Sequence, residues 1–466
     1  MDPHLDGAGY WQRALGPPSP RRPSLNGQSD FDVCVIGGGY TGLWTAWALA
    51  EADPKLKIAV VEADHVGFGA SGRNGGWLSG LLPGDRARLA QGPAGRAGVV
   101  ALQRQLIDAV GRVVTVCRTE GIDADIRMGG TLAVATNQAQ LARLGRSLGE
   151  DRRWGLGPDD ICRLGPKETA ARVQVDGAAG STFSPHCARI QPAKLVRGLA
   201  AAVERRGVKI YERTQALTVT PGRVQTPFVT VRASWIVRAT EGYTAGLPGM
   251  RRRLLPMNSS MIVTEPIPPD GWDEIGWAGA ETLRDGAHAY VYLQRTVDDR
   301  IAIGGRGVPY RYGSRLDHAG DTPSSTVAGL EAALHRLFPG TRDVPTAYAW
   351  SGVLGVARDW CPAIGVQPSG PGGLAWAGGY AGDGVTTAHL AGLTLADLIL
   401  GRETARTALP WVGHTSRNWE PEPLRWLGVR AVYGLYRSAD RVEATRPGDA
   451  RTPRRARLAD LISGRP

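Results

Sequence analysis

The sequence has few cysteines and few lysines, and both shortages narrow what the protein can be. Five cysteines are scattered over 466 residues without a C-x-x-C pair, which argues against a disulfide framework and a zinc site. We therefore expect reduced thiols and no metal. Only five of the 55 Lys and Arg residues are lysines, and no basic stripe interleaved with aromatic residues is present. The net charge of +11 is therefore not taken as a sign of nucleic-acid binding.

Long apolar runs are also missing. The longest run falls short of a membrane span, and the opening residues M-D-P-H-L-D-G lack the basic and apolar regions of a secretory signal. We expect a cytoplasmic protein that does not bind membranes. Hydrophobic residues make up 42% of the chain and charged residues 21%, which is typical of a folded protein. The length predicts two domains rather than one.

The region after residue 30 has the pattern of a nucleotide-binding βαβ unit. The apolar runs F-D-V-C-V-I (31–36) and K-I-A-V-V-E (57–62) are predicted strands of a parallel sheet, and L-W-T-A-W-A-L-A-E-A between them is a predicted helix. In the connecting G-G-G-Y-T-G, Gly37 permits a tight turn, Gly39 lets backbone approach a pyrophosphate and Gly42 lets helix and strand pack closely. Glu62 ends the second strand, where an acid binds a ribose hydroxyl. This spacing predicts a dinucleotide site, without separating NAD from FAD.

Two glycine-rich segments extend this prediction. G-A-S-G-R-N-G-G (69–76) follows the second strand, and such small residues let backbone lie against a large flat ligand. Arg73 and Asn74 could donate hydrogen bonds to phosphate or flavin carbonyl oxygens; the alternative is a flexible surface loop. Much later come a short strand at 374–377, a glycine loop at 378–384 and a helix from about Val385. The N-terminus of that helix could stabilise negative charge on the N1–C2=O edge of a reduced flavin.

These motifs resemble those of the D-amino-acid-oxidase-type FAD oxidoreductases, which include glycine, sarcosine and γ-glutamylputrescine oxidases. The γ-glutamylputrescine oxidase branch is the most similar. The resemblance covers about residues 31–402 and rests on V-I-G-G-G-Y-T-G, G-A-S-G-R-N-G-G, R-I-Q-P-A-K-L, A-T-E-G-Y-T and G-G-Y-A-G-D-G-V. It implies a small-molecule amine or amino-acid substrate, hydride transfer to FAD, an imine that hydrolyses, and dioxygen that is reduced to hydrogen peroxide.

The resemblance also implies the fold. We expect an α/β protein with an FAD-binding Rossmann-like (doubly wound) domain and an interleaved α+β substrate domain on a mixed or antiparallel sheet. The expected division is 1–29 for an irregular N-terminal arm, 30–80, 184–254 and 348–402 for the FAD-binding domain, 81–183 and 255–347 for the substrate domain, and 403–466 for a C-terminal extension. The extension contains a basic amphipathic helix, L-R-W-L-G-V-R-A-V-Y-G-L-Y-R, which we expect to dock on the protein's own surface or on a second subunit rather than on an anionic membrane.

Site residues are carried over by their matching positions. The expected FAD-binding residues are Gly37, Gly39, Tyr40, Thr41, Gly42, Glu62, Ala63, Ala70, Ser71, Gly72, Arg73, Asn74, Gly75, Gly76, Ala216, Ala239, Thr240, Glu241, Gly379, Tyr380, Gly382, Asp383, Gly384, Val385 and Thr386. The expected catalytic residues are Tyr380, Arg306 and Tyr290. Arg306 could clamp a substrate carboxylate, with a surface arginine as the alternative. We expect at most one of Tyr290 and Tyr292 to face the flavin, and we prefer a helix N-cap to a catalytic role for Asp383.

The sequence departs from the sarcosine oxidase branch at two points. That branch attaches flavin through a cysteine, but Gly352 takes this position here and Cys361 is displaced from it, so we favour non-covalent FAD over a link to Cys361. The lysine that promotes oxygen attack in that branch has no counterpart on D-R-I-A-I-G-G (299–305). A dehydrogenase that passes electrons to a quinone or a carrier protein, a tailoring oxidase of a biosynthetic pathway, and a non-enzymatic flavin-binding protein therefore stay open. The particular amine and the oligomeric state are not predicted.

Overall fold

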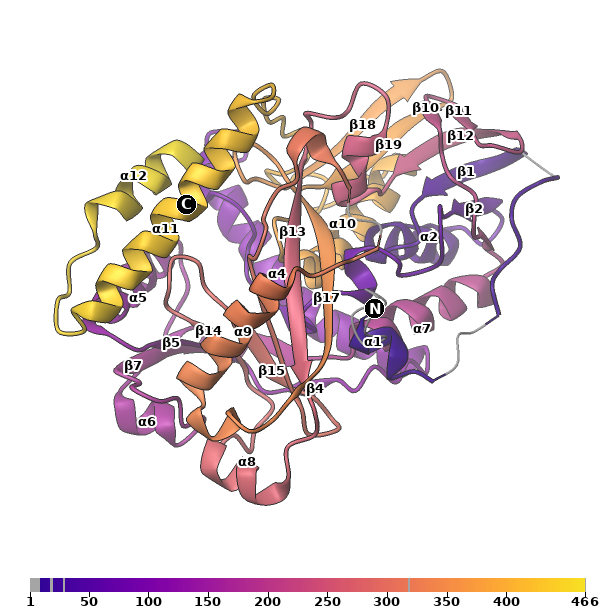
Figure 1. Ribbon diagram of the computed structural model, residues 1–466. Coiled ribbons are helices and arrows are strands. Elements are labelled where there is room, and N and C mark those ends of the chain that lie inside the picture. Colours follow the sequence, from indigo (N-terminus) through magenta and orange to yellow (C-terminus); the bar gives the residue numbers. More distant parts are fainter. Residues whose placement is uncertain (1–8, 17–19, 28–29, 317–318, 466) are drawn as a thin grey trace.

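The computed structural model describes residues 9–16, 20–27, 30–316 and 319–465 (Figure 1). Residues 1–8, 17–19 and 28–29 of the expected N-terminal arm lie outside these ranges. The described part of the arm contains a short helix, α1 (Tyr10–Arg13), with Tyr10 and Trp11 buried. The Trp11 indole donates a hydrogen bond to the carbonyl oxygen of Asn74 at 2.8 Å. The arm is therefore fastened to the 69–76 segment.

The first sheet contains the predicted βαβ unit. Its central strand β1 (Asp30–Ile36) is parallel to β2 (Ile58–Val61) on one side and to β12 (Thr230–Arg238) on the other. The order is β10-β11-β12-β1-β2-β9, and β19 joins at β12 and carries β18. The remaining strands are β9 (Lys209–Tyr211), β10 (Thr218–Thr220), β11 (Arg223–Gln225), β18 (Ala363–Ser369) and β19 (Gly372–Gly378). The second half of β1 and all of β2 are buried on both faces, as their mainly apolar runs predict.

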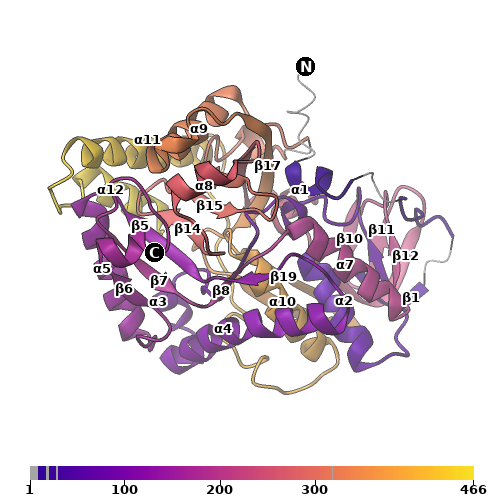
Figure 2. The same ribbon diagram turned by 90° about the horizontal axis from the view of Figure 1, so that it is seen from below.

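Four helices cover one face of this sheet, as Figure 2 shows. They lie side by side in the order α7 (Pro192–Arg205), α2 (Tyr40–Ala52), α10 (Gly384–Ile399) and α4 (Gly95–Thr119). A Cβ atom on Gly392 of α10 would lie 2.7 Å from the Trp44 backbone of α2. This glycine therefore lets α2 and α10, both of which begin at the cavity described below, pack closely.

The second sheet is mixed, as the sequence predicts. Its order is β17-β13-β16-β15-β14-β5-β7-β6, and only the β14–β5 pair is parallel among its described pairs. Its strands are β5 (Thr131–Ala135), β6 (Cys162–Leu164), β7 (Gly180–Ser184), β13 (Leu255–Thr264), β14 (Thr282–Asp285), β15 (Tyr292–Arg295), β16 (Ile301–Gly305) and β17 (Thr346–Val356). Helices α8 (Pro269–Ile275) and α9 (Ser324–Leu337) pack on it through one apolar core, and α5 (Gln138–Arg153) packs on β5 and β7.

Several small elements complete the fold. They are β3 (Trp77–Ser79), β4 (Arg127–Met128) and β8 (Cys187–Arg189), which form a third sheet, and the short helices α3 (Arg86–Leu89) and α6 (Pro166–Ala170). One difference from the expected division concerns β17, which was placed with the first sheet but pairs along its length with β13 of the second. An apolar run reveals a strand but not its partner. We keep the two-domain division as a proposal, with β17 in the second sheet.

The C-terminal extension folds back on the protein's own surface. Helices α11 (Leu424–Thr445) and α12 (Arg454–Ser463) lie side by side along one flank, close to α5 (Figure 1). Val432 and Tyr436 of α11 are buried with Ala459 of α12. The Glu443 carboxylate pairs with Arg143 of α5 at 2.9 Å. In the ranges that the structure describes, no helix has both the length and the apolarity needed to cross a membrane.

Candidate active site

A cavity of about 900 Å³ lies between the two large sheets. Residues at or just after the ends of β1, β2 and β12 form one wall, and β13, β15 and β17 contribute to the opposite wall. Ligands of open α/β sheets bind outside the carboxyl ends of the strands, which is where this cavity lies. Its size is at the upper end of the range for ligand pockets.

The glycines of the 37–42 turn leave room for backbone. Gly37 has a φ of +110°, and a Cβ atom there would lie 2.6 Å from the carbonyl oxygen of Ala239. A Cβ on Gly42 would lie only 2.0 Å from the carbonyl oxygen of Gly37. The first amides of a helix have no partner within the helix, so the start of α2 offers N–H groups to an anion. One of them, the amide of Tyr40, donates to the Ser71 hydroxyl at 2.9 Å, which joins the turn to the 69–76 segment.

Glu62 stands at the carboxyl end of β2, as the fingerprint predicts. Its carboxylate accepts hydrogen bonds from the backbone amides of Gly38 at 2.7 Å and Asp64 at 3.0 Å. Burial raises the pKa of Glu62 above its usual value, and these backbone hydrogen bonds act in the opposite direction. The carboxylate is thereby held at the wall of the cavity, beside Ala63 and Ala216.

The 69–76 segment is a hydrogen-bonded part of the wall. After the 3₁₀ turn Ala70–Gly72, the Asn74 amide nitrogen donates to the carbonyl oxygens of Ala70 and Ser71, and its oxygen accepts from the Gly76 amide. Asn74 therefore shapes the loop, whereas the sequence suggested a donor to the ligand. Arg73 lines the cavity, but its Nη1 donates to the Ser351 carbonyl oxygen at 3.0 Å and ties the loop to β17.

Glu241 connects the glycine loop at 378–384 to both sheets. Its carboxylate accepts hydrogen bonds from the amides of Gly379 at 2.9 Å, Tyr380 at 3.3 Å and Gly355 at 3.2 Å. Burial raises the pKa of Glu241 to about 7, although the three hydrogen bonds lower it. The Tyr380 hydroxyl lies 3.1 Å from that of Thr41 in α2. The loops that begin α2 and α10 therefore meet at this tyrosine.

The preference for Asp383 as a helix cap is wrong. Asp383 occupies the position before α10, but its side chain makes no capping hydrogen bond, and it lines the cavity instead. Burial raises its pKa to about 6, while the guanidinium groups of Arg284 and Arg306 lower it. A cap needs its side chain turned back onto the first amides of the helix, and here the carboxyl group faces the arginines.

Arginine and tyrosine side chains form the wall contributed by the second sheet. Arg306 follows β16, and its Nη1 is buried without a hydrogen-bond partner in the described structure. The Tyr292 hydroxyl is 2.8 Å from that of Ser259. Tyr290 and Tyr292 both line the cavity, and the expectation that at most one of them faces the flavin stays a prediction. Residues two apart along an extended chain point to the same side, and Tyr290 lies two residues before Tyr292, the first residue of β15.

Four expected cofactor residues do not reach the cavity wall: Gly42, Gly72, Gly76 and Gly379. They allow segments to approach, since a Cβ on Gly72 would lie 2.2 Å from the Gly67 carbonyl oxygen and one on Gly76 would lie 2.0 Å from the Gln294 side chain. The other expected cofactor residues and Tyr290, Arg306 and Tyr380 all line it. Their roles in binding and catalysis stay predictions.

Sequence reasoning did not find several residues of the wall, among them Asp64, Phe68, Tyr243, Arg284 and Arg465. Phe68 and Asp64 lie in the stretch between Glu62 and the glycine segment, so proximity to these motifs was a usable signal. Arg465 lies near the end of the extension, outside every motif. Nothing local in the sequence marks it.

Comparisons with known proteins agree with this geometry. The family model "DAO: FAD dependent oxidoreductase" matches residues 32–398. Gamma-glutamylputrescine oxidoreductase of Escherichia coli (strain K12) is 30% identical over 383 residues, which are 81% of this chain and 85% of that protein. Glycine oxidase of Geobacillus kaustophilus (strain HTA426) is 24% identical over 399 residues, 82% of this chain and 96% of that protein. The crystal structure of glycine oxidase from Geobacillus kaustophilus has a TM-score of 0.68 at 21% identity and covers 81% of this chain and 96% of its own.

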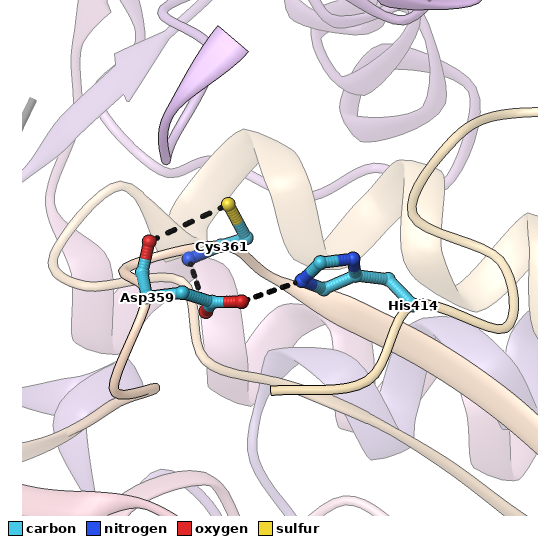
Figure 3. A group of neighbouring side chains, drawn as sticks. All are labelled: Asp359, Cys361 and His414. Atoms are coloured by element: carbon cyan, nitrogen blue, oxygen red, sulfur yellow. Dashed lines mark hydrogen bonds and ion pairs between the residues drawn. The ribbon is translucent and has the colours of Figure 1, made fainter. Parts of the chain in front are cut away.

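Cys361 lies away from the cavity, in a small cluster with Asp359 and His414 (Figure 3). His414 Nε2 is 2.8 Å from the Asp359 carboxylate, and the Cys361 thiol contacts the Asp359 carbonyl oxygen at 3.5 Å. Burial raises the pKa of Cys361 to about 12, so the thiol stays protonated and is a weak nucleophile and metal ligand. The described residues that line the cavity include no cysteine.

We therefore expect the flavin to dissociate completely when the protein is denatured. Wild-type protein and the variant Cys361→Ser should both leave no fluorescence on the chain after denaturing electrophoresis, because no described thiol lines the cavity. Fluorescence that stays with the wild-type chain and disappears in Cys361→Ser would show a thioether link.

Proposed function

Because this chain belongs to the DAO family of FAD-dependent oxidoreductases, we propose that it oxidises the carbon–nitrogen bond of an amine or amino acid to an imine with dioxygen as the final acceptor. Bound FAD supplies the hydride acceptor for the carbon beside the nitrogen. The substrate loses a hydride and a proton, water hydrolyses the imine, and dioxygen takes two electrons and two protons to give hydrogen peroxide.

The observation that carries the proposal is the continuity of one cavity. It runs from the turn of Gly37 and Gly39, with Glu62 beside it, to a chamber that holds Arg306 and Asp383. The glycine turns and the two helix N-termini suit a dinucleotide, since a Cβ atom at Gly37 would collide with backbone. A substrate in the chamber would therefore lie next to a dinucleotide that is bound at these turns.

The chamber has the charges that a zwitterionic substrate needs. Arg306 has a buried Nη1 without a partner, and a guanidinium binds a carboxylate through paired hydrogen bonds. Asp383, with a pKa of about 6, is mostly ionised above pH 7. It can therefore accept a proton from a substrate ammonium group, and the neutral amine that results is the form that gives up a hydride. Buried Tyr380 and half-buried Tyr292 help to exclude water from the reacting carbon.

A dehydrogenase is the second candidate, and one observation favours it. No lysine is among the described residues that line the cavity, so a cationic side chain of the kind that promotes oxygen attack in related oxidases would have to be an arginine. Electrons would then leave to a quinone or a carrier protein.

An anaerobic absorbance titration tests the proposal. Purified protein is titrated with glycine, sarcosine, acidic amino acids of both configurations and γ-glutamyl polyamines, and air is then admitted. We expect at least one of them to bleach the flavin, with colour and stoichiometric peroxide returning in air. Bleaching that persists in air would favour the dehydrogenase. A flavin that no amine bleaches would contradict amine oxidation.

A further inference from the structure

We infer that the C-terminal extension completes the substrate site, and that the substrate is an amine with two anionic groups, one of which is a carboxylate bound by Arg465. This inference rests on the proposed function, because it names the substrate class of the same cavity. It concerns residues outside the family match, which ends at residue 398.

The extension fixes the loop that carries Tyr290. The Asp440 carboxylate of α11 accepts hydrogen bonds from the backbone amides of His288 at 2.8 Å and Ala289 at 3.0 Å. Glu443, one turn further along α11, is 3.0 Å from His288 Nε2. Hydrogen bonds to the charged groups of a buried pair are among the stronger ones in proteins. The loop from β14 to β15 therefore takes its position from the extension.

The extension also holds the backbone of Arg306. The Arg437 guanidinium of α11 donates a hydrogen bond to the Arg306 carbonyl oxygen at 2.9 Å. Arg306 and Tyr290 are thus both placed by α11, although both belong to the second sheet's side of the cavity.

Arg465 enters the cavity itself. Its Nη1 donates to the His288 carbonyl oxygen at 3.0 Å, and its guanidinium carbon lies 5.4 Å from the ring centre of Tyr290 and 5.7 Å from that of Tyr436. One hydrogen bond and two aromatic rings hold the guanidinium. Arg465 lines the cavity, and a guanidinium has five N–H donors in all. Arg284 lies over the same Tyr290 ring at 5.8 Å.

The charges at this end of the cavity are unbalanced. Three arginines line it, Arg284, Arg306 and Arg465, together with one carboxylate, that of Asp383. In the part of the chain that the structure describes, no ion pair joins any of these arginines to an acid. A substrate with one ammonium and one carboxylate group is matched by Asp383 and Arg306. Arg284 and Arg465 then remain beside Tyr290 without an ion pair, because Asp383 and Asp460 act on them only through space. This is unfavourable for partly desolvated charges. A second carboxylate supplies that anion.

The test uses ligands that cannot be oxidised, so it does not depend on turnover. Glutarate, which has two carboxylates, is compared with pentanoate, which has one on a chain of equal length. Binding to the FAD-loaded protein is followed by the change in the flavin absorbance spectrum. The variants are Arg465→Gln and, as a matched control, Arg457→Gln, which removes the same charge from the exposed face of α12 outside the cavity.

We expect wild-type protein to bind glutarate about ten- to a hundredfold more tightly than pentanoate, as one charge-assisted contact allows. Arg465→Gln should remove most of this preference and leave pentanoate affinity unchanged, whereas Arg457→Gln should keep it. An equal thermal midpoint for both variants shows that α12 stays folded. Wild-type protein without a preference, or Arg465→Gln with the full preference, would overturn the inference.

These outcomes are separable from those of the proposed function. If an Arg465-dependent preference is found but no amine bleaches the flavin, amine oxidation fails and the dianion site stands. If amines with one carboxylate or none are oxidised and glutarate shows no preference, the reaction stands and the inference about Arg465 fails.

Discussion

The variant Gly42→Ala is expected to be purified without FAD. A Cβ atom at this position would lie 2.0 Å from the Gly37 carbonyl oxygen and 3.0 Å from a Val35 methyl group. The carbonyl cannot move away easily, because Gly37 already has a φ of +110° and packs against the Ala239 backbone. Relief of this overlap requires α2 to shift away from β1, and overpacking of this kind costs about 1–3 kcal/mol or more. The same shift moves the helix N-terminus that faces the cavity.

The flavin-to-protein absorbance ratio and the thermal midpoint measure this effect. We expect the ratio to fall by at least tenfold for Gly42→Ala, with a lower midpoint. Gly111→Ala is the matched control, because Gly111 lies in α4 and a Cβ there meets nothing within 4 Å. Alanine favours helix by about 1 kcal/mol over glycine, so this control should be as stable as wild type or more stable, with full flavin content. A yellow Gly42→Ala protein of normal stability would refute the assigned role of the turn.

Local patterns were sufficient to predict the βαβ unit of the first sheet and its glycine turns. The predicted strand at 31–36 is β1 (Asp30–Ile36), and the helix predicted from about Val385 is α10, which begins at Gly384. Both depend on short-range rules: buried parallel strands are continuously apolar, and glycine marks the turn between strand and helix. The resemblance extended these local signals to a complete cofactor site.

Features that depend on long-range contacts were not predictable. Asp383 looks like a cap because it precedes a helix, and only the positions of Arg284 and Arg306, from two other segments, show why it faces the cavity. The partner of β17 and the place of Arg465 are set in the same way, by contacts between segments far apart in the chain. The spacing of residues along the sequence does not predict such long-range contacts.

Arg306→Met is expected to lower kcat/KM greatly without lowering stability. The Nη1 of Arg306 is buried and makes no hydrogen bond in the described structure, so the folded protein holds a desolvated cation without a full set of partners. Replacing such an unpaired charge with an apolar side chain of similar length removes its desolvation cost, so the stability should stay equal or rise. Loss of one partner of a buried charge pair in a complex costs about 2–5 kcal/mol, which is roughly thirtyfold or more in affinity for a carboxylate substrate.

Stability is expected to be kept while activity toward amino acids falls, and this difference separates a functional arginine from a structural one. The thermal midpoint of Arg306→Met should equal or exceed that of wild type, while KM for an amino acid rises and oxidation of an amine without a carboxylate changes little. Arg306→Lys should recover only part of the affinity, because an ammonium group lacks the planar pair of donors. Arg118→Met, on the exposed end of α4, should change neither readout. A lower midpoint with an unchanged KM would mean that Arg306 serves the packing of β16, and that the carboxylate binds elsewhere in the cavity.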